Sequence, residues 1–260
     1  MKTLFGTDGI RGRAYEPPLD EDTVRRLGAA LAADLSGVGG APRILLAGDT
    51  RRSTVDLAEW IASSVQAGGG NVVWGGVLPT PAVSQLCREG DFSAGIVISA
   101  SHNPAGDNGI KILGPTGEKV ADEIERHLEQ RLEDTRPLFG RALPKVDRGL
   151  GRRYVDLLVA THETPTPLAG LHVVVDAANG AASGIAGEFL ERLGARATLI
   201  AASPDGDNIN DGCGATAPGH LAETVLEMGA DAGIALDGDA DRVVLVDEHG
   251  SVLDGDDILL

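Results

Sequence analysis

The chain has 260 residues and a formal net charge of −17, and only 3% of its residues are aromatic. This length allows one large or two ordinary domains, whose cores must be built mainly from Ala, Val, Leu and Ile. The negative charge excludes a general nucleic-acid-binding or membrane-surface role, because both partners are themselves anionic. An anionic small substrate would therefore need a local group of positive side chains.

Cysteine usage and the N-terminal residues indicate the compartment. Cys87 and Cys213 lie far apart in the sequence and lack the spacing of metal ligands, which predicts buried, reduced thiols. The N-terminal residues contain no long apolar signal-peptide core, and no stretch is apolar enough to cross a bilayer. We expect a soluble cytoplasmic protein that contacts neither nucleic acid nor membrane.

The chain opens with a glycine-rich segment, residues 4–12. Glycines at every third position would let backbone amides approach a ligand, and Arg11 would offer a fork suited to phosphate. A plain bend is the alternative interpretation. The apolar pattern then predicts, in chain order, a helix over 20–35, a strand over 43–49, a helix over 55–66, a strand over 71–74 and a helix opening at 78–82.

A polar loop around Ser101 follows the next predicted strand, the β-branched run at 96–98. The loop contains His102, and the chain returns as a second apolar strand over 109–113 that includes Lys111. Loops at the ends of buried strands are where open α/β sheets place their chemistry. A simple chain reversal by Ser, Asn and Pro is the alternative.

The second half repeats the alternation of strands and helices. Residues 133–147 predict a linker, and the segment Ala94-Gly-Ile-Val-Ile returns in similar form as Ala232-Gly-Ile-Ala-Leu before another polar loop. The fold class is therefore α/β, with two consecutive similar domains, mainly parallel mixed sheets and active-site loops at strand ends. Chance similarity of the two strands is the alternative. The other predicted elements are a turn at 114–117, helices over 121–132 and 151–160, a strand over 171–176, a turn at 177–180, a helix to about 193, a strand over 196–201, a polar loop at 203–214 and a helix over 220–228.

Three carboxylates alternate in the second polar loop, at Asp237, Asp239 and Asp241. Carboxylates this close repel one another unless a cation lies among them, and oxygen ligands favour Mg²⁺. With Glu248 they also match an EF-hand spacing, but the position that requires glycine holds Arg242 and the flanks predict strands. We exclude the EF-hand, and a solvated acidic turn remains as the alternative.

The serine and the acidic loop together suit phosphoryl transfer. Adjacency in the sequence alone does not make His102 the base of a catalytic triad with Ser101. The sequence also contains neither a nucleophile elbow nor a P-loop. A serine beside Mg²⁺, with Arg11, Lys111 and Arg242 available, could carry a phosphoryl group whose charge the metal and the cations spread.

Five motifs carry a resemblance that covers the whole chain. They are the segments 5–12 (FGTDGIRG), 98–104 (ISASHNP), 107–111 (DNGIK), 208–210 (NIN) together with 213–216 (CGAT), and 237–242 (DGDADR). The chain resembles the α-D-phosphohexomutase superfamily. Its opening motif favours the phosphoglucosamine mutases over the phosphomannomutases and phosphoglucomutases, which remain the alternative.

The resemblance implies interconversion of glucosamine 6-phosphate and glucosamine 1-phosphate, on the route to UDP-N-acetylglucosamine and the cell wall. Ser101 would be carried as phosphoserine and would exchange its phosphoryl group with a bisphosphorylated sugar. Mg²⁺ would be held by a phosphate oxygen on Ser101 and by the three aspartates of the acidic loop. The implied partner is a phosphorylated hexosamine, and a homodimer is allowed.

The resemblance also implies roles for the basic residues of the site. Arg11 and Arg242 match positions that would stabilise charge. Lys111 or His102 would transfer protons.

The expected domains are 1–147 with the phosphoserine loop, 148–249 with the metal loop, and 250–260 as the start of a truncated third domain. The family has four domains, and the sugar-binding and distal phosphate-binding loops of its third and fourth have no counterpart in this sequence. We therefore expect weak or no mutase activity from this chain alone. A metal-dependent phosphatase and a non-catalytic Mg²⁺-binding fragment are the remaining alternatives.

Overall fold

The computed structural model describes residues 4–36 and 40–259. The chain forms two compact units, the first from Met1–Ala100 and Gly106–Leu150, and the second from Ser101–Ala105 and Gly151–Leu260. The five residues that begin at Ser101 therefore pack with the second unit, although the strands on both sides of them belong to the first. The first three residues, part of the segment in which we expected no signal-peptide core, lie outside the described residues.

Among the described residues of the first unit, five strands form one sheet in the order β1-β5-β4-β2-β3. Strand β2 is parallel to its neighbours β3 and β4, and β5 is antiparallel to both β4 and β1. The strands are β1 (Ile10–Arg13), β2 (Arg43–Gly48), β3 (Asn71–Val77), β4 (Ala94–Ile98) and β5 (Asp107–Leu113).

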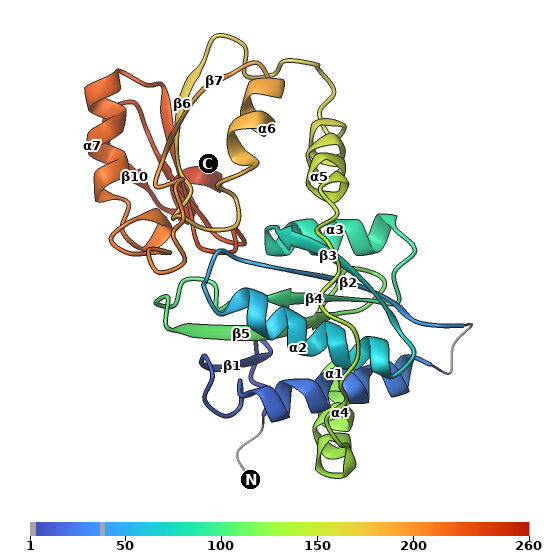
Figure 1. Ribbon diagram of the computed structural model, residues 1–260. Coiled ribbons are helices and arrows are strands. Elements are labelled where there is room, and N and C mark those ends of the chain that lie inside the picture. The colour runs from blue at the N-terminus through green and yellow to red at the C-terminus, as the bar shows by residue number, and fades with distance from the viewer. Residues whose placement is uncertain (1–3, 37–39, 260) are drawn as a thin grey trace. The chain divides into compact units, whose positions relative to one another are not determined.

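Helices cover both faces of this sheet, with α3 on the face opposite α1 and α2 (Figure 1). A strand that is buried on both faces needs a continuous apolar run, and every residue of β4 is buried. Asp20 caps α1 by accepting a hydrogen bond from the backbone N–H of Thr23 at 3.1 Å. The helices are α1 (Glu21–Leu35), α2 (Thr54–Ala67), α3 (Thr80–Glu89) and α4 (Asp122–Asp134).

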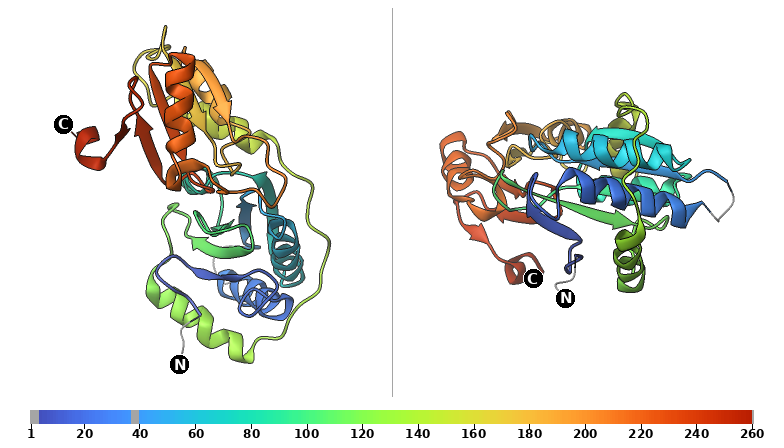
Figure 2. Two further views of the ribbon diagram at one scale, coloured as in Figure 1. Left: turned by 90° about the vertical axis from the view of Figure 1, so that its left-hand side faces the viewer. Right: turned by 60° about the horizontal axis from the view of Figure 1, so that its bottom comes forward.

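In the described part of the second unit, five strands form a sheet in the order β10-β9-β8-β6-β7. Helices α6 and α7 lie on opposite faces of it (Figure 1), and β10 and α8 lie at one edge (Figure 2). The strands are β6 (His172–Asp176), β7 (Arg196–Ile200), β8 (Ala232–Leu236), β9 (Val243–Val246) and β10 (Val252–Leu253). Helix α5 (Gly149–Val159) begins in the last two residues of the first unit. The other helices are α6 (Ala186–Arg192), η1 (Gly214–Thr216), α7 (Gly219–Met228) and α8 (Gly255–Leu259).

The two sheets share one plan, which confirms the predicted α/β class with two similar units. Ala94 of β4 pairs with Ile44 of β2, and Ala232 of β8 pairs in the same way with Val173 of β6. Each unit has three parallel strands, and the last of them forms an antiparallel hairpin with the next strand, β4 with β5 or β8 with β9. The edge strand next to this hairpin comes from opposite ends of the sequence in the two units. Strand β1 precedes the other strands of the first unit, whereas β10 follows the other strands of the second.

The end of the glycine-rich opening, Ile10–Arg13, forms the edge strand β1, an element that the sequence analysis did not predict. Gly9 has a φ of +91°, and a Cβ there would lie 2.4 Å from the backbone oxygen of Ile110. Glycine therefore serves the close approach of β1 to β5.

One predicted helix starts later than expected, and the predicted linker over 133–147 starts two residues late because α4 extends to Asp134. The helix predicted to follow 177–180 begins later, at Ala186. The segment after α4 has no helix or strand over 135–147 and runs as an extended trace (Figure 2). It is nevertheless fixed to the first unit, since Gly140 donates to Ser63 and Asp147 donates to the backbone oxygen of Trp74, both at 2.8 Å.

Both cysteines are free and buried, as predicted. Burial raises the pKa of each thiol to about 11. Within residues 4–36 and 40–259, no helix combines the length and the apolarity needed to cross a membrane.

We predict that Gly9→Ala destabilises the first unit by about 2 kcal/mol or more, since the new Cβ would meet the β5 backbone in a left-handed conformation. Urea unfolding followed by tryptophan fluorescence would measure this loss, because Trp60 and Trp74 both lie in the first unit. Gly114→Ala is the matched control, since its Cβ would come no closer than 3.9 Å to any neighbour. Equal unfolding midpoints for the two variants would contradict the prediction.

Candidate active site

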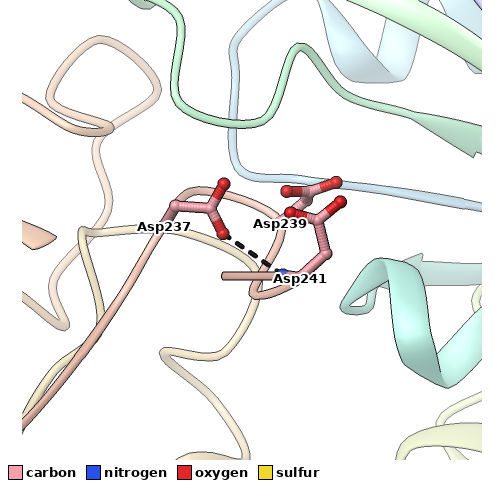
Figure 3. A group of neighbouring side chains, drawn as sticks. All are labelled: Asp237, Asp239 and Asp241. Carbon is pink, nitrogen blue, oxygen red and sulfur yellow. Dashed lines mark hydrogen bonds between the residues drawn. The ribbon is translucent and has the colours of Figure 1, made fainter. Parts of the chain in front are cut away.

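The acidic loop follows β8 and gathers its carboxylates by bonding back onto itself. Oδ1 of Asp237 accepts a hydrogen bond from the backbone N–H of Asp241 at 3.2 Å (Figure 3). It accepts a second from the backbone N–H of Arg242, also at 3.2 Å. Asp237 and Asp239 are buried, and Asp241 is exposed. One oxygen from each of the three carboxylates lies within 4.8 Å of the other two. The alternating aspartates are therefore brought together, as the sequence predicted.

This donor set fits a magnesium ion. Mg²⁺ binds oxygen at about 2.1 Å, so opposite ligands of an octahedral ion lie about 4.2 Å apart. The three carboxylate oxygens lie within 4.8 Å of one another, so they are gathered into a space of the size that one such ion spans, and a cation would reduce the repulsion among three negative charges. The EF-hand is excluded by the structure as well, because strands β8 and β9 flank the loop where helices would be required.

Ser101 lies directly against this loop within the second unit. Its side chain is buried, and Oγ donates a hydrogen bond to Oδ2 of Asp237 at 2.5 Å. Nδ1 of His102 lies 3.3 Å from the same Oγ. The backbone of Ser101 is left-handed, with a φ of +53°. A hydroxyl that is buried, strained and bonded to a carboxylate of a candidate metal site is typical of a reacting group.

Asn210 ties the long polar loop to the serine segment. Its Nδ2 donates to the backbone oxygens of Ser101 at 2.9 Å and Asn103 at 3.2 Å. The loop itself is held by Asp176 at the end of β6, which accepts from the backbone N–H groups of Ala178 and Gly214 at 2.9 and 2.8 Å. The sequence analysis named Asn210 only as part of a motif and assigned no role to Asp176. An aspartate at the end of a predicted apolar strand is a pattern that could have identified Asp176 as a candidate.

Gly238 is required by close packing at the centre of the site. A Cβ there would lie 2.6 Å from the backbone oxygen of Ser101 and 2.9 Å from Nδ2 of Asn210. The backbone oxygen of Gly238 in turn accepts from the N–H of Ala181 at 2.8 Å. Three segments of the second unit therefore meet around one residue without a side chain. Non-glycine residues with left-handed backbones gather on these same segments, and they are Ser101, Ala178, Asn179, Asn210 and Ala240.

The predicted basic residues lie on different elements. Arg11 on β1 and Lys111 on β5 belong to neighbouring strands of the first unit, where Arg11 is opposite Gly109 and Lys111 is opposite Val97. Nη2 of Arg11 lies 3.7 Å from Oδ2 of Asp8. Arg242 follows the acidic loop in the second unit, and its side chain is 53% exposed. The second unit alone thus brings together Ser101, His102, Asp237, Asp239 and Asp241.

The family models for known proteins match both units. The model described as phosphoglucomutase/phosphomannomutase, alpha/beta/alpha domain I, matches residues 2–138, and that of domain II matches residues 152–250. The chain belongs to this family. The two matched ranges contain the serine loop and the acidic loop respectively, so the family's first two domains carry the site described above.

Curated relatives in the family are similar over nearly all of this chain. "Phosphoglucosamine mutase" of Sorangium cellulosum is 47% identical over 99% of the chain and 55% of its own length, and that of Paracoccus denitrificans is 46% identical over 99% and 59%. The crystal structure of a phosphoglucomutase/phosphomannomutase family protein from Burkholderia thailandensis matches with a TM-score of 0.82 at 26% identity, covering 97% of this chain and 56% of that one. The chain thus spans a little over half the length of these relatives.

We predict that Asp239→Asn weakens Mg²⁺ binding at least about tenfold while leaving the fold intact, because it removes ligand charge at nearly constant volume. Isothermal titration calorimetry with MgCl₂ would measure the change. Glu248→Gln is the control, since Glu248 is exposed and would be a ligand only in an EF-hand. Unchanged affinity for Asp239→Asn, or a loss for Glu248→Gln, would contradict the assignment of the metal site.

Proposed function

We propose that this chain supplies the phosphoserine and metal-binding units of a phosphoglucosamine mutase. The reaction would interconvert glucosamine 6-phosphate and glucosamine 1-phosphate through a bisphosphorylated sugar. The observation that carries the proposal is the 2.5 Å hydrogen bond from Ser101 Oγ to Asp237, which joins the candidate phosphate carrier to the candidate metal site. The names of the two bacterial relatives support the choice of sugar.

The proposed transfer is a direct exchange at Ser101 Oγ. A sugar hydroxyl forms a new bond to phosphorus as the bond from phosphorus to Oγ breaks, and Oγ leaves as an alkoxide that takes up a proton. The proton of the sugar hydroxyl passes to a base, for which His102 and Lys111 are the candidates. The return transfer reverses these steps with the other phosphate of the bisphosphorylated sugar.

The aspartates and arginines would stabilise charge during this exchange. Asp237, Asp239 and Asp241, with a phosphate oxygen on Ser101, would hold Mg²⁺. When bound, the ion neutralises charge on the transferring phosphoryl group. Arg11 and Arg242 would add fixed positive charge, because a guanidinium can contact two phosphate oxygens at once. The buried setting of Ser101 would strengthen each of these interactions by excluding water.

Other activities share parts of this site. A phosphomannomutase or phosphoglucomutase would use the same residues on another sugar, and a metal-dependent phosphatase would release phosphate to water. The site would also serve a non-catalytic Mg²⁺-binding fragment. We further propose a cytoplasmic homodimer, with domain limits at 1–147, 148–249 and 250–260.

We predict that incubation with glucosamine 1,6-bisphosphate and Mg²⁺ places one phosphoryl group on Ser101, and that Ser101→Ala abolishes this labelling. Intact mass spectrometry followed by peptide mapping would locate the group. Ser251→Ala is the control, because Ser251 is an exposed hydroxyl in the turn between β9 and β10.

Two results would refute the proposal. Labelling of Ser101→Ala at the wild-type stoichiometry would show that the nucleophile lies elsewhere. Release of inorganic phosphate as fast as the labelled serine decays, with no bisphosphorylated sugar re-formed from added glucosamine 6-phosphate, would show a phosphatase.

A further inference from the structure

A fully buried ion pair lies at the end of β2 in the first unit. Nε of Arg51 donates to Oδ2 of Asp49 at 2.9 Å, and both side chains are 0% exposed. The backbone N–H of Arg51 donates to the other carboxylate oxygen at 3.1 Å. Burying two charges is costly, and such a pair is weak evidence for stability by itself. The other contacts of these two side chains indicate a role besides stability.

The pair contacts both stems of the loop that carries Ser101. On the outgoing side, the hydroxyl of Ser99 donates to Oδ2 of Asp49 at 2.6 Å. On the returning side, Nη1 of Arg51 donates to the backbone oxygen of Asp107 at 3.0 Å. Ser99 is the first residue after β4, and Asp107 is the first residue of β5. One ion pair thus joins the residue that opens the loop to the residue that closes it.

Further hydrogen bonds fix the pair and the stems together. Oγ1 of Thr54, at the start of α2, donates to Oδ1 of Asp49 at 3.1 Å. Nδ2 of Asn108, the residue after Asp107, donates to Oγ of Ser53 at 2.9 Å. The two stems are also joined directly, because the N–H of Ser99 donates to the backbone oxygen of Gly109 at 3.0 Å. The network belongs entirely to the first unit and leaves both carboxylate oxygens of Asp49 with donors.

We propose that Asp49 and Arg51 are positioning residues for phosphoryl transfer, which act through Ser99 and Asp107 to fix where the Ser101 loop leaves the sheet and returns to it. This inference rests on the proposed role of Ser101 as the phosphate carrier. Its physical basis is that small misplacements of a reacting group are expensive in rate: a shift of about 1 Å can cost about 100-fold. A planar guanidinium can hold a carboxylate and a carbonyl in two fixed directions, whereas an ammonium cannot reproduce that geometry.

The electrostatics of Asp49 are consistent with this arrangement. Burial raises the pKa of its carboxyl group above the ordinary value, and the guanidinium of Arg51 and the hydroxyl of Ser99 offset only part of this rise. Losing either partner would therefore favour a protonated Asp49, which would then have a donor where the network needs an acceptor.

Three substitutions test the proposal: Arg51→Lys, Asp49→Asn and Ser99→Ala. Labelling of Ser101 by glucosamine 1,6-bisphosphate should slow about 100-fold in the first two and about tenfold in the third. Mg²⁺ affinity should stay within about twofold of wild type, because the aspartate ligands lie in the other unit. Amide hydrogen exchange over residues 99–107 should become faster, while exchange in the core of β2 should not.

The control is Glu125→Gln, which weakens a second largely buried ion pair of the first unit, between Glu125 Oε2 and Lys119 Nζ at 2.7 Å. It should lower the melting temperature without changing labelling or exchange over residues 99–107. The positioning role is overturned if Arg51→Lys and Ser99→Ala slow labelling no more than this control does, or if exchange over residues 99–107 is unchanged. If Asp49→Asn fails to fold, the labelling rate and the hydrogen exchange of Ser99→Ala test the positioning role, because this substitution removes only one hydroxyl.

The same data separate this inference from the proposed function. If the wild-type chain takes up no phosphoryl group, the proposed function fails, and the positioning role in phosphoryl transfer fails with it. Faster exchange over residues 99–107 in Arg51→Lys would then still show that the ion pair orders the loop. If the wild type is labelled and the variants are labelled equally fast, only the positioning role fails.

Discussion

The oxygens of Asp237, Asp239 and Asp241 lie within 4.8 Å of one another, and two of these side chains are buried. Repulsion among them must be balanced, and the loop does so in part with its own backbone, which donates two hydrogen bonds to Asp237. A divalent cation would reduce the electrostatic repulsion that remains among the three carboxylates. The loop is thus shaped by its charge, and the hydroxyl of Ser101 is drawn into the same arrangement through Asp237.

Holding these groups together requires backbone conformations that most residues avoid. Ser101 and Ala240 are left-handed, a conformation that costs roughly 1–2 kcal/mol for a residue with a side chain. Neither would keep it without support from neighbouring segments. Asn210 gives that support to the serine segment through its hydrogen bond to the backbone oxygen of Ser101, and the missing side chain of Gly238 leaves room for both partners of that bond. Pre-organisation at this site therefore depends on tight packing around a few polar contacts.

The sequence predicted the parts of the structure that depend on local pattern. The two strand-end loops were identifiable because an apolar run stops abruptly at polar residues, and the carboxylates because they alternate within one short loop. The contacts made by Arg51 and Asn210 were not predictable, since their partners Asp107 and Ser101 lie 56 and 109 positions away. Strand β1 was missed because its four residues, Ile-Arg-Gly-Arg, show no apolar alternation, and only pairing with β5 makes them a strand.

The edge strands enter the two sheets from opposite ends, which gives the units different histories as the chain is synthesised. Strand β1 leaves the ribosome first, but its partner β5 is far away in the sequence, with Ile10 opposite Ile110. Its hydrogen-bonding edge stays open until most of the first unit has emerged, and open edges invite pairing with other chains. Strand β10 follows β9 through a short turn, with Val252 opposite Val246, so its pairing is local and fast. The two glycines and two arginines around β1 reduce the risk of aggregation during the time before β5 is available. A short, charged and weakly strand-forming edge is a poor template for pairing with other chains.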